Sequence, residues 1–201
     1  MALAPHSFQA HFLLAFFLEI SGRHADALAQ YLLAGRANPR LAFVHYDLGR
    51  RGGNLAVRLK EWDRAAALVK EALRFKDDGE LLFLLATSLY QSGQRDEAEK
   101  AYLEILSRDP QQVASLVNLG YLYLDAASFQ KAQELHRRAL DVSPENEAAL
   151  FGLALALQRG GRAEEASRRW QEFLEKHPQS PWRKKAEMNL EQLTPLNAVK
   201  N

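Results

Sequence analysis

The sequence contains no cysteine, which excludes disulfide bonds and thiolate metal ligands. It also lacks an uninterrupted apolar run of the roughly 18 residues that a membrane-spanning helix needs. The apolar stretch Phe12–Leu18 lies between His11 and Glu19, and no Lys or Arg precedes it. We therefore predict neither membrane insertion nor a signal peptide. We expect a cytoplasmic protein, or a periplasmic one if a leader was removed.

Net charge is scarce as well. Lys and Arg together number 26, Asp and Glu number 25, and the formal net charge is +1. A chain without a global positive field is not expected to bind nucleic acid. Its 201 residues are 47% hydrophobic, which is enough for a core and argues against wholesale disorder.

Sequence motifs of catalysis and metal binding are also missing. The six histidines form no HExxH motif and no close metal-ligand spacing, and the chain has no phosphate-binding P-loop. The glycine-rich segment Gly49–Gly53 follows no predicted strand, and His136 is expected to be a packed core residue. We therefore predict that the protein is not an enzyme and holds no cofactor and no metal.

What the sequence does contain is a repeat of about 34 residues. An alanine recurs with successive spacings of 38, 33, 34 and 34 residues, and a proline follows twelve residues after four of the five alanines. Self-similarity at this period indicates a helical solenoid. The alanines are Ala27, Ala65, Ala98, Ala132 and Ala166, and the prolines are Pro39, Pro110, Pro144 and Pro178.

Each repeat is predicted to form two helices. Apolar residues recur every three or four positions, which is typical of α-helix. Short breaks, such as Ser92–Gln94 and Gly160–Arg162, separate the two helices within a repeat, and the prolines end the second helix. Because two short helices cannot bury their apolar faces alone, neighbouring repeats are expected to stack.

This pattern resembles the tetratricopeptide repeat family. The resemblance covers residues 8–180 and implies an all-α, right-handed α-α superhelix of antiparallel helix pairs, in a single domain spanning residues 1–201. In the first repeat it is carried by Leu14, Ala15, Leu18, Gly22, Ala27, Tyr31, Ala34 and Pro39. The expected repeats are 8–41, 42–78, 79–112, 113–146 and 147–180, followed by a capping helix at 181–193 and a frayed tail at 194–201.

The second repeat departs from the family pattern. Four residues are inserted before it, which is about one helical turn, so we predict one lengthened helix from about Leu41 to Leu59. Gly49, Gly52 and Gly53 should each weaken this helix. They indicate either close packing against a neighbouring helix, or a local hinge or bound partner backbone. Early hydrogen exchange across the helix would favour the hinge.

The resemblance also implies a binding groove. In the family, the first helices line the concave face and direct their second, fifth, ninth and twelfth residues into it. These positions predict an apolar, aromatic-rich trough, in which the fifth-position residues also pack between adjacent helices. The predicted groove residues are Phe12, Phe16, Phe83, Thr87, Tyr90, Val117, Tyr121, Leu124, Phe151, Leu155 and Gln158.

The second repeat adds polar groups to this predicted groove. Arg50, Asn54 and Arg58 are four residues apart and share one helix face. Guanidinium groups can bind carboxylates or phosphates at two points, and an asparagine can hold a peptide backbone. The alternative is internal pairing, against Glu19 or Asp47.

We therefore predict a non-catalytic scaffold or adaptor that binds a peptide or helix of another protein. Two alternatives stay open: a homo-oligomeric structural module that packs through its apolar face or near Phe12–Leu18, and a helper of a bacterial envelope assembly or secretion system, as many bacterial relatives are. Binding of heat-shock chaperone tails is not expected. Of the Lys, Asn and Arg set that some family members use for it, only Asn118 falls in a suitable position.

Overall fold

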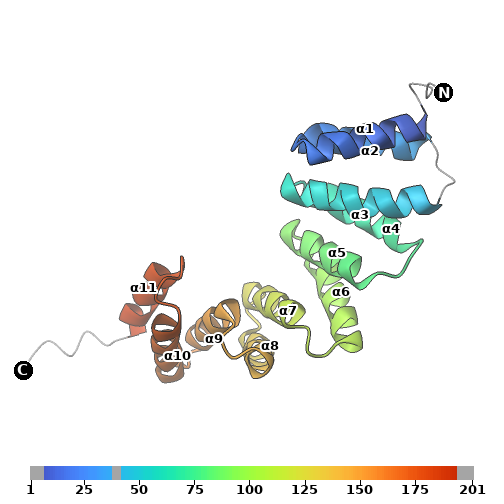
Figure 1. The fold of residues 1–201 in the computed structure, drawn as a ribbon. Coiled ribbons are helices and arrows are strands. Elements are labelled where there is room, and N and C mark those ends of the chain that lie inside the picture. Colours follow the sequence, from blue (N-terminus) through green and yellow to red (C-terminus); the bar gives the residue numbers. More distant parts are fainter. Residues whose placement is uncertain (1–6, 38–41, 194–201) are drawn as a thin grey trace, which may run out of the picture. The chain divides into compact units, whose positions relative to one another are not determined.

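The computed structural model describes residues 7–37 and 42–193, in which the regular structure is entirely helical (Figure 1). The predicted tail at 194–201 and Pro39 lie outside these residues. The helices group into two compact units, Met1–Ile105 and Leu106–Asn201, called here the N-terminal and C-terminal units. The N-terminal unit holds α1 (Phe8–Ile20), α2 (His24–Ala37), α3 (Ala42–Arg58), α4 (Trp62–Leu73), α5 (Gly79–Gln91) and most of α6 (Arg95–Arg108). The C-terminal unit holds α7 (Val113–Asp125), α8 (Phe129–Val142), α9 (Glu147–Arg159), α10 (Ala163–Lys176) and α11 (Arg183–Leu193).

Each predicted repeat contains one helix hairpin, and the predicted all-α fold of stacked helix pairs is confirmed. In the N-terminal unit, α1 packs on α2, α2 on α3, α3 on α4 and α4 on α5. In the C-terminal unit, α7 packs on α8, α8 on α9, α9 on α10 and α10 on α11. That residues 1–201 form a single domain stays a prediction.

The turn inside each hairpin requires one residue in the left-handed backbone conformation. Gly22, Gly93 and Gly161 fill this position with φ of 76°, 83° and 79°. Lys60 and Ala127 occupy the equivalent place in the other two hairpins, with φ of 59° and 55°. Because a Cβ atom is disfavoured in this conformation, these two turns are strained where the other three are relaxed.

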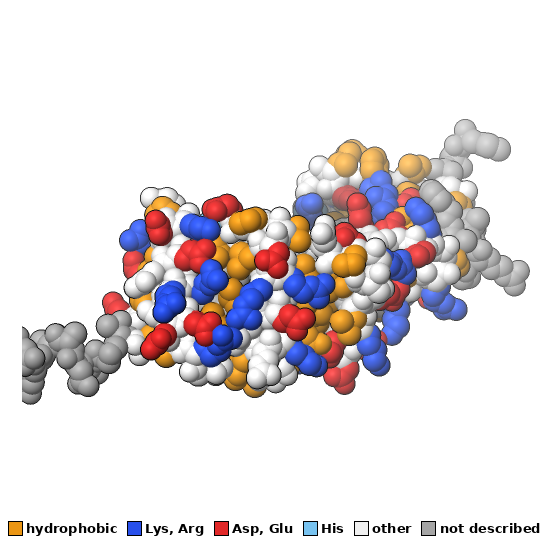
Figure 2. Space-filling model, turned by 90° about the horizontal axis from the view of Figure 1, so that it is seen from below, with side chains coloured by type: hydrophobic (Ala, Val, Ile, Leu, Met, Phe, Trp, Pro, Cys, Tyr) orange, Lys and Arg blue, Asp and Glu red, His pale blue; other side chains and the backbone are white. Residues whose placement is uncertain are grey.

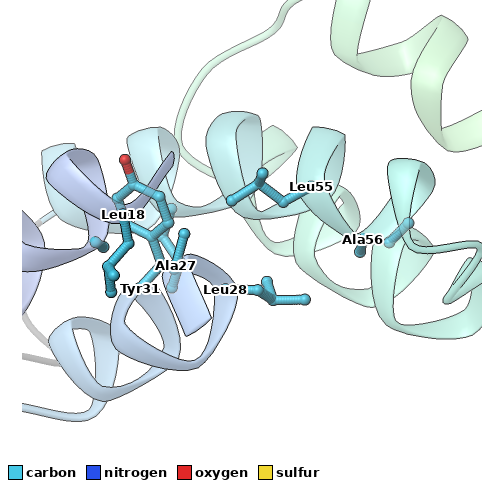
Figure 3. Close-up of a cluster of buried hydrophobic side chains, with 9 residues drawn as sticks. Leu18, Ala27, Leu28, Tyr31, Leu55 and Ala56 are labelled. Atoms are coloured by element: carbon cyan, nitrogen blue, oxygen red, sulfur yellow. The ribbon is translucent and has the colours of Figure 1, made fainter. Parts of the chain in front are cut away.

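The five recurring alanines form the spine of the core. Each is 0% exposed, and so is the residue four positions later on the same helix face. A small side chain therefore lets the neighbouring helix approach, and a larger one fills the space beyond it. The five larger partners are Tyr31, Val69, Tyr102, His136 and Trp170. Figure 3 shows this arrangement in the N-terminal unit, where Tyr31 and Ala27 lie with Leu18, Leu28 and Leu55.

The lengthened second-repeat helix is confirmed as α3, which has 17 residues. Its glycines face neighbouring helices at close range. A Cβ atom added to Gly49 would lie 2.2 Å from the Ala72 Cβ, and one added to Gly53 would lie 2.5 Å from Val69 Cγ2. Ala72 and Val69 belong to α4, so the glycines serve close packing of α3 on α4, as one of the two interpretations predicted.

A final helix covers the end of the C-terminal unit. α11 buries Ala186 completely and packs Leu190 and Leu193 against a core cluster that contains Trp170 and Phe173. Its outer side carries an exposed ion pair between Arg183 and Glu187, 2.8 Å apart. The predicted capping helix is thus confirmed, with a first residue two positions after Pro181.

Candidate protein-interaction surfaces

The predicted groove residues of α1 divide into a packed and an accessible member. The Phe12 ring is half-buried and meets the Tyr31 ring edge-on, with centroids 5.3 Å apart. Phe16 is 41% exposed, and the Arg51 guanidinium carbon lies 5.0 Å from its ring centroid. The ninth position of α1 therefore offers an apolar ring to solvent, with a cation beside it.

Arg51 belongs to a three-residue network that no pattern in the sequence indicates. The Tyr31 hydroxyl donates to Glu19 Oε2 at 2.7 Å, and Arg51 Nη1 lies 3.1 Å from the same oxygen. Burial and the hydrogen bond to Glu19 raise the pKa of Tyr31 above its ordinary value, so it is neutral at physiological pH. Among the described residues, the buried Nε of Arg51 has no hydrogen-bond partner. The network joins α1, α2 and α3.

The exposed polar row of α3 is partly satisfied by its own helix. Arg50 Nη2 lies 3.1 Å from Asp47 Oδ1, and Asn54 Nδ2 donates to the Arg50 carbonyl oxygen at 2.6 Å. The predicted internal pairing is therefore confirmed for Arg50 with Asp47. Arg58 is exposed and has no ion-pair partner among the residues that the structure describes. Its guanidinium keeps its full donor capacity for a carboxylate.

On α5, the predicted residues mainly hold the hairpin together. Phe83 is half-buried, with its ring centroid 6.2 Å from that of Tyr102. The Tyr102 hydroxyl donates to Thr87 Oγ1 at 3.3 Å. Tyr90 is half-buried near the end of the helix. This part of the row joins α5 to α6 more than it faces solvent.

Three predicted groove residues of the C-terminal unit are covered. Val117, Leu124 and Phe151 are 7%, 3% and 5% exposed, so the expectation that they form an accessible wall is corrected. Phe151 is covered because its ring packs against Trp170, with centroids 4.8 Å apart, and against other aromatic rings around it. α7 buries most of its length, including Val117 and Leu124. These side chains cannot contact a ligand without repacking.

The remaining predicted residues of this unit, Tyr121, Leu155 and Gln158, are half-buried. The Tyr121 hydroxyl donates to the Ala148 carbonyl oxygen at 2.8 Å, so the side chain ties α7 to α9. Leu155 packs against the terminal core cluster, and Gln158 Oε1 accepts from Trp170 Nε1 at 2.8 Å. All three have structural contacts in addition to any role in binding.

Two residues that were not among the predicted groove positions, one just before α11 and one on it, extend the surface beside Phe151. Trp182 is 37% exposed, with its ring centroid 5.3 Å from that of Phe151. Lys185 Nζ lies 5.7 Å from the Phe151 ring centroid. In the sequence, the only indication of this contact is that Trp182 directly follows Pro181, the residue predicted to begin the capping helix.

The buried His136 is confirmed as a core residue. It is 0% exposed, and Cβ atoms added to Gly120 and Gly152 would lie 2.7 Å and 2.3 Å from its ring. Neither ring nitrogen has a hydrogen-bond partner within the described part of the chain. Burial lowers the pKa of His136 to about 4, so the imidazole is neutral at physiological pH.

Within residues 7–37 and 42–193, no three His, Cys, Asp or Glu side chains gather closely enough to hold a metal ion. In the same range, none of the helices combines the length and apolarity of a transmembrane span. On the face of the C-terminal unit that Figure 2 shows, basic and acidic side chains are interspersed. What the described surfaces can do is contact other macromolecules through apolar and charged side chains.

Comparisons with known proteins agree with this architecture. A family model described as tetratricopeptide repeat matches residues 56–119 and 123–186. The BBSome complex member BBS4 homolog of Drosophila melanogaster is 29% identical over 145 residues, which are 67% of this chain and 29% of that protein. The chain thus spans less than a third of the length of the curated relatives that it matches.

Solved structures show the same fold. A tetratricopeptide repeat protein from Parabacteroides merdae superposes with a TM-score of 0.79 at 19% identity, covering 92% of this chain and 72% of that one. YrrB, titled a TPR protein with an unusual peptide-binding site, superposes with a TM-score of 0.72 at 17% identity, covering 89% and 91%. Proteins of this kind are generally non-catalytic interaction modules. With the repeated hairpins, the alanine spine and a family match over more than half of its length, the chain belongs to the tetratricopeptide repeat family.

Proposed function

We propose that this chain is a non-catalytic scaffold that holds a segment of another protein against the first helices of its repeats. The observation that carries the proposal is the contrast between Phe12 and Phe16. The Phe12 ring packs against Tyr31, whereas Phe16 keeps 41% of its surface exposed at the position that faces the groove in the family. An exposed aromatic ring beside a cation is a suitable anchor point for a partner side chain.

The α3 residues near Phe16 define the chemistry of the partner. Arg51 lies beside the Phe16 ring, and Arg58 follows two helical turns later, about 10 Å along the helix axis. Arg58 is exposed and has no ion-pair partner among the described residues. A partner segment with an apolar side chain for Phe16 and a carboxylate for Arg58 would satisfy both groups.

The comparisons support a protein as the ligand class. The Drosophila relative is named as a member of a complex, and the same fold carries a peptide-binding site in YrrB. In the C-terminal unit, the exposed part of Trp182 and the half-buried Leu155 would form a separate contact patch. Val117, Leu124 and Phe151 have no part in the proposal because they are buried.

The test is affinity capture from the source cell, quantified by mass spectrometry. The groove variant is Phe16→Ser with Arg58→Glu, because both side chains are exposed and their loss should leave the fold intact. The matched control is Leu103→Ser with Arg74→Glu, which changes an exposed leucine on α6 and an exposed arginine after α4.

We expect at least one protein to be captured by the wild type and the control but recovered about tenfold less by the groove variant. Its direct affinity, measured with a fluorescent peptide of the partner, should fall in the same order. Equal capture by all three proteins would contradict the proposal. Circular dichroism of the three proteins checks that helix content is unchanged.

A further inference from the structure

The outward side of α1 is apolar and uncovered. Leu13, Leu14, Phe17 and Ile20 are 58%, 46%, 62% and 66% exposed. These four residues, called here the α1 outer face, lie within about 60° of the direction of Phe17 on a helix with 3.6 residues per turn. Ala15 and Leu18, on the other side, are the buried residues of α1. The helix is thus apolar on both its inner and outer sides.

The first and last hairpins of the described residues differ in what covers their outer sides. At the C-terminal end, α11 covers the α9–α10 hairpin and turns the Arg183–Glu187 pair outward. At the N-terminal end, no helix of the described residues covers the outer face of α1. In a solenoid each repeat buries its apolar faces against neighbouring repeats, and within the described residues the outer face of α1 has no such neighbour. A surface of this kind marks an interface.

We propose that the α1 outer face binds the same face of a second copy of this chain, in an antiparallel two-fold pair. If the two-fold axis passes beside Phe17, the two Phe17 rings meet, and Leu14 of each copy faces Ile20 of the other. Leu13 then lies opposite Ser21. Symmetry therefore pairs apolar with apolar groups across the centre, as an isologous interface requires.

The charges around α1 permit this pairing. The first turn of α1 has no acidic residue and its last turn no basic residue. Glu19 points away from the outer face, because its carboxylate is bound by Tyr31 and Arg51 on the inner side. His11 Nδ1 contacts Gln30 Oε1 at 2.8 Å within the same hairpin. None of the four outer-face side chains is charged, and antiparallel approach of two copies places each helix N-terminus beside a C-terminus, which the helix dipoles favour.

The area fits a weak, concentration-dependent pair. The four outer-face side chains present about 450 Å² of apolar surface, given their exposed fractions. A symmetric pair would therefore remove about 900 Å² from water through these side chains. That area lies below the ~1,200 Å² of standard interfaces and in the range of transient ones.

The absence of cysteine makes a direct test possible. Phe17→Cys introduces a single thiol next to the proposed two-fold axis, where two copies can form a disulfide. Leu103→Cys, at an exposed leucine of α6, is the matched control. Under mild oxidation at about 50 µM protein, we expect Phe17→Cys to become mostly covalent dimer and Leu103→Cys to stay mostly monomer. Equal cross-linking of the two variants would overturn the proposal.

Sedimentation equilibrium provides the second readout. The wild type should show a monomer–dimer equilibrium between about 1 and 100 µM, and Phe17→Glu should be monomeric throughout, while Leu103→Glu should behave like the wild type. A monomeric wild type at 100 µM refutes the second copy as occupant. If the wild type were monomeric and a variant lacking residues 1–6 formed the dimer, residues 1–6 of the same chain would be what covers the α1 outer face. That result would also refute the proposal. Phe16 and Arg58 are unchanged in these variants, so the outcome is independent of partner capture in the groove.

Discussion

The packing of α3 on α4 leads to a sharp prediction for Gly49→Ala. In the interior of a helix, this substitution normally stabilises by up to about 1 kcal/mol, because alanine restricts the unfolded chain and favours helix. At Gly49 the new Cβ would lie 2.2 Å from the Ala72 Cβ and 2.6 Å from the Leu68 carbonyl oxygen. Neither atom can rotate away, since one is a Cβ and the other is backbone. α4 would have to retreat by about 1.3 Å to bring the two Cβ atoms to the ~3.5 Å of ordinary van der Waals contact.

Overpacking of this kind typically costs 1–3 kcal/mol, and a contact with two rigid atoms belongs at the upper end of that range. After subtracting the gain in helix propensity, we expect Gly49→Ala to lower the free energy of unfolding by about 2 kcal/mol. Gly52→Ala is the matched control, one turn away on the same helix. Its new Cβ would meet Leu68 Cδ1 at 3.3 Å and Leu28 Cδ1 at 3.5 Å, which are ends of flexible side chains. That variant should be neutral or slightly more stable than the wild type.

Hydrogen exchange with mass spectrometry measures the effect locally. A loss of about 2 kcal/mol should lower the protection of amides in α3 and α4 by about 30-fold in Gly49→Ala, with little change in the C-terminal unit. A Gly49→Ala protein as well protected as the Gly52→Ala protein would refute the close-packing argument. Early exchange of α3 in the wild type would instead support the hinge that its glycines also suggested.

Three further predictions concern a buried ring, a strained turn and a helix cap. His136 has a folded-state pKa of about 4, below its ordinary 6.5, so the unfolded chain takes up the proton first as the pH falls. The free energy of unfolding, measured by urea unfolding, should fall by about 2 kcal/mol between pH 7 and pH 5. An equal fall in a His136→Phe protein would show that His136 is not its cause. Ala127→Gly should raise the free energy of unfolding by up to about 1 kcal/mol, because φ of 55° is strained for alanine; a lower urea midpoint would count against it. Asp78 accepts hydrogen bonds from the backbone N–H groups of Glu80 and Leu81 at the start of α5. Asp78→Ala should therefore lower the free energy of unfolding by about 1 kcal/mol and speed hydrogen exchange of the amides in the first turn of α5. Unchanged exchange in that turn would contradict the capping role.

Much of the fold could be predicted because the core repeats in the sequence. The alanine at each equivalent position is fully buried, and so is the residue four positions later. Together with the turn residues, this pair sets the period and the helix boundaries. The lengthened α3 was predictable for the same reason, since an added turn keeps the helix in phase.

The candidate site was less predictable, because equivalent positions in the repeats do not have equivalent surroundings. Phe16 and Phe151 were assigned to the same groove, but Phe151 is covered by the large rings of Trp170 and its neighbours. On α3, Arg51 rather than Arg50 reaches Glu19, and these neighbours differ by about 100° around the helix. Repeat position alone does not resolve a rotation of that size after an insertion.

The outer face of α1 shows a second limit of sequence patterns. Phe12–Leu18 is apolar around the whole helix, so its spacing does not distinguish a buried side from an exposed one. The packing of Ala15 and Leu18 against the rest of the N-terminal unit makes that distinction.

The imidazole of His136 also limits how the repeats can be exchanged. It stands on α8 and is enclosed by the glycine of its own repeat, Gly120, and by that of the following repeat, Gly152. Neither glycine can gain a methyl group unless the ring moves or becomes smaller. Modules of repeat proteins are commonly shuffled as separate building blocks. Here residues 113–146 and 147–180 both pack against the His136 ring, so engineering would have to transplant the two repeats as a pair.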